Sequence, residues 1–403
     1  MTGPILQVAL PSPLRRLFDY RAPRGVGAAD LHIGQRVRVP FGKRAMVGLI
    51  AAISDHSEVP DNRLKPAEAL LDATPVLPDS LWRLCQWTAR YYQHGLGDTL
   101  SVALPVLLRQ GEPALARQDQ LWQLLPGAYP EHPAIARAPK QKQAVQVLAQ
   151  HPHGLSHALI SQWGLSRDTL STLESKGLVQ RIEQSPHHIA EPLPLLREAH
   201  LTANAEQQAA LDAILHAEGF HTWLLEGVTG SGKTEVYLQA MAPVLAAGKQ
   251  VLMLVPEIGL TPQTLRRFRQ RFAVPVTVLH SGLTDRERLD AWVAARDGRA
   301  RIIIGTRSAV FTPLAHPGLI IVDETHDASL KQQDGFRYHA RDLATWRAQQ
   351  LAVPVVHGSA TPALETLHLA RTGRPWLARP RLLVACARLV VVAACPPGFG
   401  AFR

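Results

Sequence analysis

Cysteine is scarce in this sequence. The three cysteines among 403 residues are Cys85, Cys386 and Cys395. Because no two of them form a CxxC pair, their spacing excludes a zinc ribbon and a disulfide framework. Long apolar runs are also missing, since the stretch 382–395 is too short to cross a bilayer and contains Arg388. We therefore expect a protein of a reducing, cytoplasmic compartment that has no membrane partner.

Acidic residues are outnumbered by basic ones. The sequence has 33 Asp and Glu against 43 Lys and Arg, a formal net charge of +10. This excess favours a polyanionic partner, above all nucleic acid. With 46% hydrophobic and 19% charged residues, the chain can bury sizeable cores, which excludes a disordered protein. Its length suggests two to four domains at roughly 100–200 residues per domain.

The first block of the chain, residues 1–105, is rich in strand-like segments. These segments lie at 6–10, 36–39 and 46–53, with turn residues between them. A helical pattern follows at 80–92. We expect a small β-rich domain that is closed by a helix.

The middle of the chain is divided by prolines. Residues 106–138 are expected to form a linker. The block 139–183 then has three helical patterns and one strand, at 140–150, 155–163, 166–176 and 178–182. Ser166 suits an N-cap and Gly177 a C-cap. This order is typical of a winged helix-turn-helix, and an ordinary three-helix unit is the alternative. A second linker is expected at 184–200.

Strands alternate with helices over residues 201–376. The strands are expected at 222–225, 251–255, 276–279, 302–304, 319–322 and 355–357. Near-continuous apolar strands joined by helices indicate a parallel sheet that is covered on both faces. Thr261 and Thr284 suit the N-caps of two helices. The fold class is therefore multidomain α/β, with a β-rich N-terminal domain, a winged helix and a parallel-sheet lobe.

The sharpest motif is GVTGSGKT at residues 227–234, a complete GxxxxGK[ST]. It follows an expected strand and opens an expected helix, which is the context of a phosphate-binding P-loop. Lys233 would reach the β- and γ-phosphates of ATP, and Thr234 would bind Mg²⁺. Backbone N–H groups of the loop would cradle a phosphate. The other residues of this cradle are Gly227, Gly230, Ser231 and Gly232.

A second motif, LIIVDETH at 319–326, delivers two acids at the end of an apolar strand. In parallel sheets, sites lie at this end of the strands. Asp323 suits Mg²⁺ through its water shell, and Glu324 suits the base that orients or deprotonates the attacking water. A P-loop followed by a DExH sequence predicts a RecA-like ATP-hydrolysing lobe.

Weaker stretches fit nucleotide sensing and DNA contact. The sequence GSAT at 358–361 resembles the SAT motif of helicases. The sequence GTRS at 305–308, which includes Arg307, has N–H groups and hydroxyls that would hold a phosphodiester backbone. For each of the two, a plain turn of small residues is an equal alternative. The helix 264–272 carries four arginines, for which DNA contact and a solvated basic face are equal alternatives.

The segment 331–342 interleaves aromatic and basic residues on a glycine-containing loop. Phe336, Arg337 and Tyr338 fit stacking on unpaired bases, which would couple DNA contact to the nearby Glu324. The alternative is a loop whose aromatic rings pack on the core.

Taken together, these motifs resemble the PriA family of replication-restart helicases. The resemblance covers residues 5–375. The matching strings are FDY, RVRVPFGK, LPVLLRQG, GVTGSGKTEVYL, VPEIGLTPQT, LHSGL, GTRSAVFTP, KQQDGFRYHARDLA and GSATPALE. The resemblance implies an ATP- and Mg²⁺-dependent 3′→5′ DNA helicase that recognises stalled or branched forks and initiates primosome assembly. It implies branched and single-stranded DNA, primosome proteins and single-strand-binding protein as partners of a nucleoid-associated monomer.

The resemblance also implies roles for individual residues. The block 1–105 corresponds to the family's domain for the 3′ end of a nascent strand, and 139–183 to its winged helix. Gln207 matches a glutamine placed near adenine, and 331–342 matches the family's aromatic-rich loop. The matches to the terminal-nucleotide pocket are Phe18, Asp19, Tyr20, Gly42 and Lys65.

The sequence departs from the family at several places. Thr325 stands where the family usually has a second Glu, and Leu330 where an aromatic residue is common. The family's second lobe, zinc-binding cysteines and C-terminal domain have no counterpart in these 403 residues. Residues 377–403 do not match and contain no Asp or Glu. We expect an aberrant, frameshifted or truncated tail; the alternative is a divergent tail that packs as a last strand on the lobe.

These departures leave two functions open for the chain. One is the helicase of the family. The other is a branched-DNA binding module without motor activity, with fork binding and weak nucleotide binding but little ATPase activity and no unwinding. Another kind of P-loop translocase is disfavoured by the strings FDY and PFGK.

Overall fold

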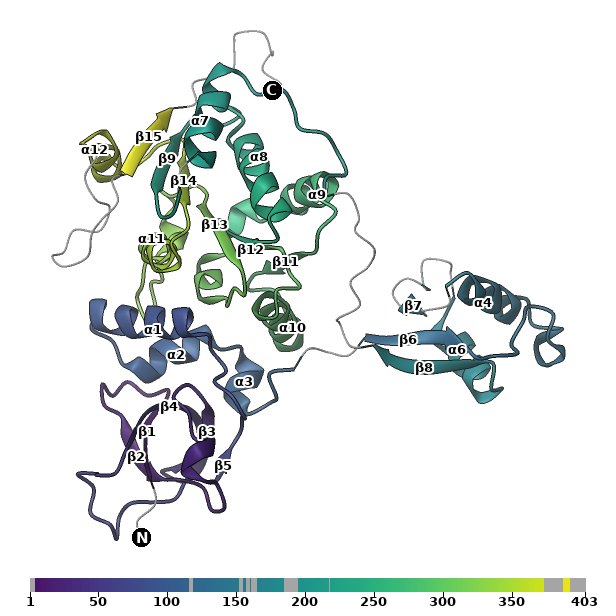
Figure 1. Ribbon diagram of the computed structural model, residues 1–403, viewed down its shortest axis with the longest axis horizontal. Helices are drawn as coiled ribbons and strands as arrows, with labels where there is room; N and C mark the ends of the chain where they lie inside the picture. The colour runs from purple at the N-terminus through teal and green to yellow at the C-terminus, as the bar shows by residue number, and fades with distance from the viewer. Residues whose placement is uncertain are drawn as a thin grey trace. The chain divides into compact units, whose positions relative to one another are not determined.

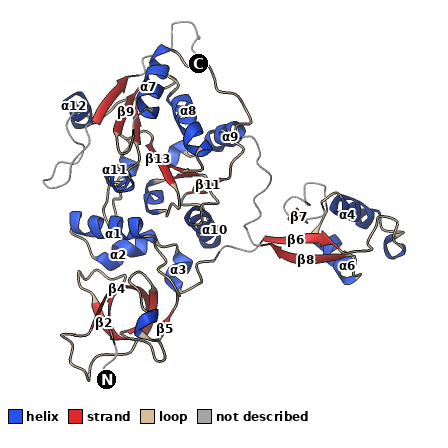
Figure 2. Ribbon diagram, viewed as in Figure 1, coloured by secondary structure: helices blue, strands red, loops and turns tan. Residues whose placement is uncertain are grey.

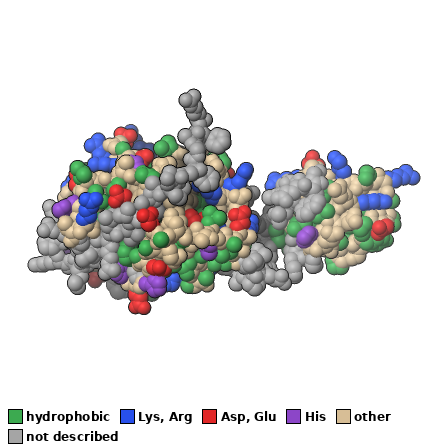
Figure 3. All heavy atoms as spheres, turned by 90° about the horizontal axis from the view of Figure 1, so that it is seen from above, with side chains coloured by type: hydrophobic (Ala, Val, Ile, Leu, Met, Phe, Trp, Pro, Cys, Tyr) green, Lys and Arg blue, Asp and Glu red, His purple; other side chains and the backbone are tan. Residues whose placement is uncertain are grey.

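The computed structural model describes residues 4–115, 119–151, 155–156, 160, 165–184, 195–216, 218–372 and 387–391. The chain forms two compact units (Figure 1). The first unit contains residues 1–115 and 194–403, and the second contains residues 116–193. On the face shown in Figure 3, Lys and Arg side chains lie scattered among acidic ones over both units, so positive charge is not gathered in one patch there.

The first unit begins with an antiparallel five-stranded sheet in the order β2-β1-β4-β3-β5. Its strands are β1 (Ile5–Ala9), β2 (Phe18–Arg21), β3 (Arg36–Phe41), β4 (Arg44–Ser54) and β5 (Ala69–Leu70). The three strands predicted for this block are thus confirmed. Gly42 lies in the tight β3–β4 turn with a φ of +62°, a conformation that favours glycine. Alternate residues such as Leu6, Val8 and Val37 point into one core.

Three helices connect this sheet to the rest of the first unit. They are α1 (Asp79–Tyr91), α2 (Leu96–Ala103) and α3 (Val106–Gln110). The ring of Trp87 in α1 stacks on that of Trp346, with ring centroids 4.9 Å apart. The indole N–H of Trp292 donates to the Ala103 carbonyl at 3.1 Å. The β domain is therefore docked on the lobe that follows through its own helices.

The lobe is a parallel seven-stranded sheet in the order β11-β12-β10-β13-β14-β9-β15 (Figures 1 and 2). Its strands are β9 (Thr222–Glu226), β10 (Gln250–Leu254), β11 (Val276–Leu279), β12 (Ile302–Gly305), β13 (Pro317–Val322), β14 (Val355–Ser359) and β15 (Ala387–Val391). The first six strands are those predicted. All residues of β10 and β12 are buried, which explains their continuous apolar character.

Helices cover both faces of this sheet. They are α7 (Ala205–Leu215), α8 (Lys233–Ala246), α9 (Pro262–Arg271), α10 (Asp285–Arg296), α11 (Ala340–Leu351) and α12 (Leu364–Thr372). The predicted N-caps are present, since the Thr261 and Thr284 hydroxyls accept from the backbone N–H groups of Thr264 and Glu287. Residues of α7, α8 and α9 share one core with the strands.

The tail expected at 377–403 contains a seventh strand. Residues 387–391 form β15, which pairs in parallel with β9 from Thr222 to Glu226. This pairing matches the alternative of a tail that packs as a last strand. The other residues of the predicted tail from 377 onward lie outside the described residues.

The second unit combines a three-stranded antiparallel sheet with helices. The strands β6 (Asp119–Leu124), β7 (Leu155–Ser156) and β8 (Val179–Gln184) have the order β7-β6-β8, and the helices are α4 (Pro139–Ala149) and α6 (Arg167–Ser175). The Ser166 hydroxyl caps α6, and Gly177 follows it with a φ of +68°. Most of the helix predicted at 155–163 lies outside the described residues, and its first two residues form β7.

The prediction of a linker over 106–138 is wrong in part, because this segment contains α3 and β6. Pro113 and Pro126 flank the strand and so leave its ladder intact. Leu121 and Trp122 are buried in β6. Most of the second predicted linker, 184–200, lies outside the described residues. No helix in the described part of the chain is long and apolar enough to span a bilayer.

Candidate nucleotide and DNA-end sites

The P-loop joins the end of β9 to the start of α8. Gly230 and Gly232 have φ values of +85° and +88°, so both need the conformational freedom of glycine. A Cβ at Gly232 would also lie 2.3 Å from Nε2 of Gln207. The Ser231 hydroxyl is buried, and no hydrogen bond to it occurs among the described residues. The loop therefore has tightly turned backbone and an unpaired polar group beside the helix N-terminus.

The structure brings the P-loop lysine to the acid pair. Nζ of Lys233 donates to the Gly227 carbonyl at 2.7 Å and lies 3.8 Å from Oε1 of Glu324. The Lys233 side chain is 7% exposed and that of Glu324 is 35% exposed, so solvent reaches this pair from the side of the glutamate. Thr234, Asp323 and Glu324 line the same cavity, whose volume is about 700 Å³. The predicted catalytic residues thus share one site.

Asp323 is held by two donors on one oxygen. Its Oδ1 accepts from the Tyr237 hydroxyl at 2.9 Å and from the Glu324 N–H at 3.0 Å. Burial, followed by the neighbouring Glu324 charge, raises the pKa of Asp323. A carboxylate and the Thr234 hydroxyl are hard oxygen ligands, so this donor set fits Mg²⁺. Among the described residues, no cluster of three or more His, Cys, Asp or Glu side chains could hold a metal ion.

Gln207 connects the start of α7 to the P-loop. Its side chain and that of Asn204 form a capping box, and its Nε2 donates to the Ser231 carbonyl at 3.0 Å. The same amide therefore closes the helix N-terminus and supports the phosphate-binding turn. The placement of Gln207 near adenine stays a prediction from the family resemblance.

An ion pair at this cavity was not predicted, although its arginine belongs to the arginine-rich helix 264–272. Arg271 at the end of α9 forms a bidentate pair with Glu235, with contacts of 2.9 and 2.8 Å, and its side chain is 7% exposed. Arg267 of the same helix also lines the cavity. The arginine-rich helix thus turns part of its basic face to the nucleotide site. Glu235 directly follows the GKT of the P-loop, and this was the available signal.

The SAT sequence lies beside the acid pair. The Thr325 N–H donates to the Gly358 carbonyl at 2.9 Å, and Nδ1 of His326 lies 2.8 Å from the Ser359 hydroxyl. The segments therefore meet at the carboxyl ends of β13 and β14, as adjacent parallel strands require.

The aromatic loop packs against the segment that joins α1 to α2. Phe336 and Tyr338 are 6% and 2% exposed. The Phe336 ring stacks on His94 with centroids 4.9 Å apart, whereas Arg337 is exposed. The two rings thus follow the packing alternative in this structure. Arg307 donates to the carbonyls of Ser329 and Lys331, which ties the GTRS segment to the start of this loop.

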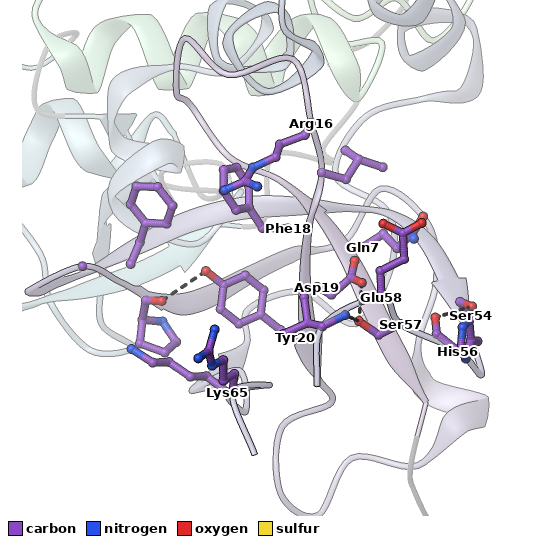
Figure 4. A pocket seen from close by; sticks show the side chains of 16 residues that line it. Gln7, Arg16, Phe18, Asp19, Tyr20, Ser54, His56, Ser57, Glu58 and Lys65 are labelled. Carbon is purple, nitrogen blue, oxygen red and sulfur yellow. Dashed lines mark hydrogen bonds between the residues drawn. The ribbon is translucent and has the colours of Figure 1, made fainter. Parts of the chain in front are cut away.

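A second cavity of about 840 Å³ lies on the β domain (Figure 4). It is lined by all five residues that the family resemblance assigned to the terminal-nucleotide pocket: Phe18, Asp19, Tyr20, Gly42 and Lys65. The Tyr20 hydroxyl donates to the Pro40 carbonyl at 3.1 Å. The Phe18 ring meets Phe41 edge-on at 5.1 Å. β2 therefore presents an aromatic ring, a carboxylate and a second aromatic ring in succession.

Other residues of this cavity were not predicted. The Ser57 hydroxyl donates to Asp19, and the Arg16 guanidinium lies 5.0 Å from the Phe18 ring centroid. Figure 4 shows Ser57 close to Asp19. Ser57 lies in the loop after β4, far from Asp19 along the chain, so no local pattern could reveal it.

Two family models match this architecture. Residues 7–105 match a PriA 3′ DNA-binding domain, and residues 204–370 match the DEAD/DEAH box helicase family. The fold and the P-loop–DExH site thus define a DEAD/DEAH-type helicase lobe joined to a 3′ DNA-binding domain.

Curated relatives narrow this class. The chain is 44% identical to the replication restart protein PriA of Haemophilus influenzae, over 92% of this chain and 51% of the relative. It is 32% identical to that of Bacillus subtilis, over 89% of this chain and 53% of the relative. The chain belongs to the PriA family, and it spans about half the length of the curated relatives it matches.

Solved structures with some likeness to this chain include a helicase domain. The Hef helicase domain of Pyrococcus furiosus is 23% identical, with a TM-score of 0.36, over 49% of this chain and 40% of that one.

Proposed function

We propose that the chain is the DNA-end-binding and ATP-binding part of a 3′→5′ DNA helicase that recognises stalled or branched forks for replication restart. The observation that carries the nucleotide part is the 3.8 Å approach of Lys233 to Glu324. A P-loop lysine and a base can act on one triphosphate only if they share a site. The family's primosome and single-strand-binding proteins are the partners expected for such a role.

At the nucleotide site, each residue has a separate task. The loop N–H groups and Lys233 bind the β- and γ-phosphates of ATP. Thr234 and Asp323 would hold Mg²⁺, which supplies charge stabilisation on the phosphate oxygens. Glu324 accepts a proton from, or orients, the attacking water. Gln207 holds the phosphate-binding turn in place through the Ser231 carbonyl.

At the β-domain cavity, the chemistry fits a terminal nucleotide. Phe18 offers a ring on which the last base can stack. The Asp19 carboxylate can accept a hydrogen bond from a free 3′ hydroxyl, and the exposed Lys65 can pair with a phosphate. A branched-DNA binding module without a motor is the second candidate, because this cavity lies on a sheet separate from the P-loop lobe.

The test is a fluorescence titration of the 403-residue chain with forks that carry or lack a 3′ hydroxyl at the branch. We expect Asp19→Ala to lose the preference for the hydroxylated fork, by about the 1.5–3 kcal/mol of a hydrogen bond to a charged group. Lys233→Ala should lose ATP binding and keep fork binding. An unchanged end preference in Asp19→Ala would show that the cavity is not the end-binding site.

A further inference from the structure

The Tyr237 hydroxyl lies between the P-loop helix and the acid strand. Tyr237 follows Lys233 by four residues in α8, so both side chains lie on one face of the helix. Tyr237 is 1% exposed, and its hydroxyl donates to Oδ1 of Asp323 at 2.9 Å. It therefore links the element that binds phosphate to the element that delivers the magnesium ligand.

This hydrogen bond fixes which oxygen of Asp323 remains available. Oδ1 already accepts from Tyr237 and from the Glu324 N–H. Among the described residues, no hydrogen bond engages Oδ2. A buried carboxylate that is held through one oxygen has a defined rotamer, and outer partners of this kind orient metal ligands.

Gly358 makes room for the same hydroxyl. A Cβ at this position would lie 1.6 Å from the Tyr237 oxygen and 3.1 Å from Oδ1 of Asp323. The φ of Gly358 is outside the left-handed region, so its backbone does not require glycine. The residue that starts the GSAT sequence is therefore small because the hydroxyl of Tyr237 occupies the space above it.

We propose that Tyr237 is a positioning residue that orients Asp323 toward the Mg²⁺ of bound ATP, and that Gly358 keeps the space which this contact needs. This inference rests on the ATP-binding function proposed above. It assigns a role to a residue outside the GKT and DExH motifs.

The experiment compares the affinity of the chain for a fluorescent ATP analogue in EDTA and in Mg²⁺. Adding Mg²⁺ should raise the affinity of the unchanged chain, and we expect Tyr237→Phe to reduce this gain by about tenfold. Tenfold is the lower end of the usual effect of removing a residue that hydrogen-bonds to a metal ligand. The affinity of the variant in EDTA should stay close to that of the unchanged chain, and the loss of one buried hydrogen bond should lower its melting temperature without unfolding it at the temperature of the titration. Gly358→Ala should reduce the same gain, because its methyl group displaces the hydroxyl.

Tyr92→Phe is the matched control, since it also removes one tyrosine hydroxyl, here an acceptor for the His339 N–H. It should leave the Mg²⁺-dependent gain unchanged. The inference is overturned if Tyr237→Phe keeps the full gain, or if its affinity falls equally with and without Mg²⁺, as a purely structural role would give. If the unchanged chain binds no nucleotide in either condition, the proposed function itself fails.

Discussion

At the scale of single residues, Gly232 holds the P-loop in a backbone conformation that other residues adopt only at a cost. Its φ is +88°, and a Cβ there would meet the Gln207 amide. We predict that Gly232→Ala lowers the free energy of unfolding by about 1–2 kcal/mol through backbone strain. It should also displace Gln207 from the Ser231 carbonyl and weaken ATP binding. Urea unfolding and a titration with an ATP analogue measure the two effects.

Gly335→Ala is the control that distinguishes backbone strain from the clash with Gln207. Gly335 has a φ of +63°, but no atom lies within 4 Å of the position that its Cβ would take. The variant should lose similar stability and keep the ATP affinity of the unchanged chain. Equal ATP affinities in the two glycine variants would contradict the role given to Gln207.

The sequence could predict the site residues that belong to a contiguous motif. Lys233 and Glu324 belong to motifs at the ends of parallel strands, and such ends meet at one edge of a sheet. Tyr237 and Arg271 could not be found in this way. Tyr237 meets Asp323 across 86 positions of the chain, and Arg271 meets Glu235 across 36. A buried tyrosine or arginine gives no sign in sequence of which distant acid it faces.

At the scale of elements, one buried guanidinium in β3 pairs with an acid after β5 and hydrogen-bonds to α3. Arg36 is fully buried, lies 2.6 Å from Asp72 and also donates to the Leu108 and Glu112 carbonyls. We predict that Asp72→Asn lowers the free energy of unfolding by about 3–5 kcal/mol, because it leaves a buried cation without its partner. Chemical denaturation measures this loss.

Asp61→Asn is the comparison for that prediction. Asp61 pairs with Arg21 at 3.2 Å, but its side chain is 73% exposed. The variant should change stability by less than about 1 kcal/mol, as surface pairs do. Similar losses in both variants would show that burial does not decide how much these two ion pairs stabilise the fold.

The elements differ in how well the sequence predicted them. The six strands that were predicted for the lobe are apolar runs bounded by helix caps and turns, and all six are present in the structure. β6 was missed because prolines on both sides suggested a linker, although Leu121 and Trp122 are buried there. For the aromatic loop, the sequence showed which residue types are present but not which way their rings point. Phe336 faces His94 of the β domain, a contact between segments that no local pattern connects.

At the scale of the whole first unit, the β domain and the lobe are joined by side chains. The Trp87–Trp346 stack, the Trp292–Ala103 hydrogen bond and the Arg296–Ala114 hydrogen bond at 2.9 Å all cross this junction. We predict that Trp87→Ala separates their unfolding, so that calorimetry shows an additional transition. Trp122 lies in the second unit, so Trp122→Ala should lower only the melting temperature of that unit. A single unchanged transition in Trp87→Ala would mean that the other contacts suffice.

The indole stack at this junction has a mechanical consequence. If a DNA strand is held by its 3′ end on the β domain while the lobe pulls on the template, the force between the two passes through the junction. The Trp87–Trp346 stack is one of the side-chain contacts that would carry this force. Pulling a single fork with optical tweezers would therefore load this junction, and in Trp87→Ala the β domain should separate from the lobe at a lower force while it keeps the DNA end.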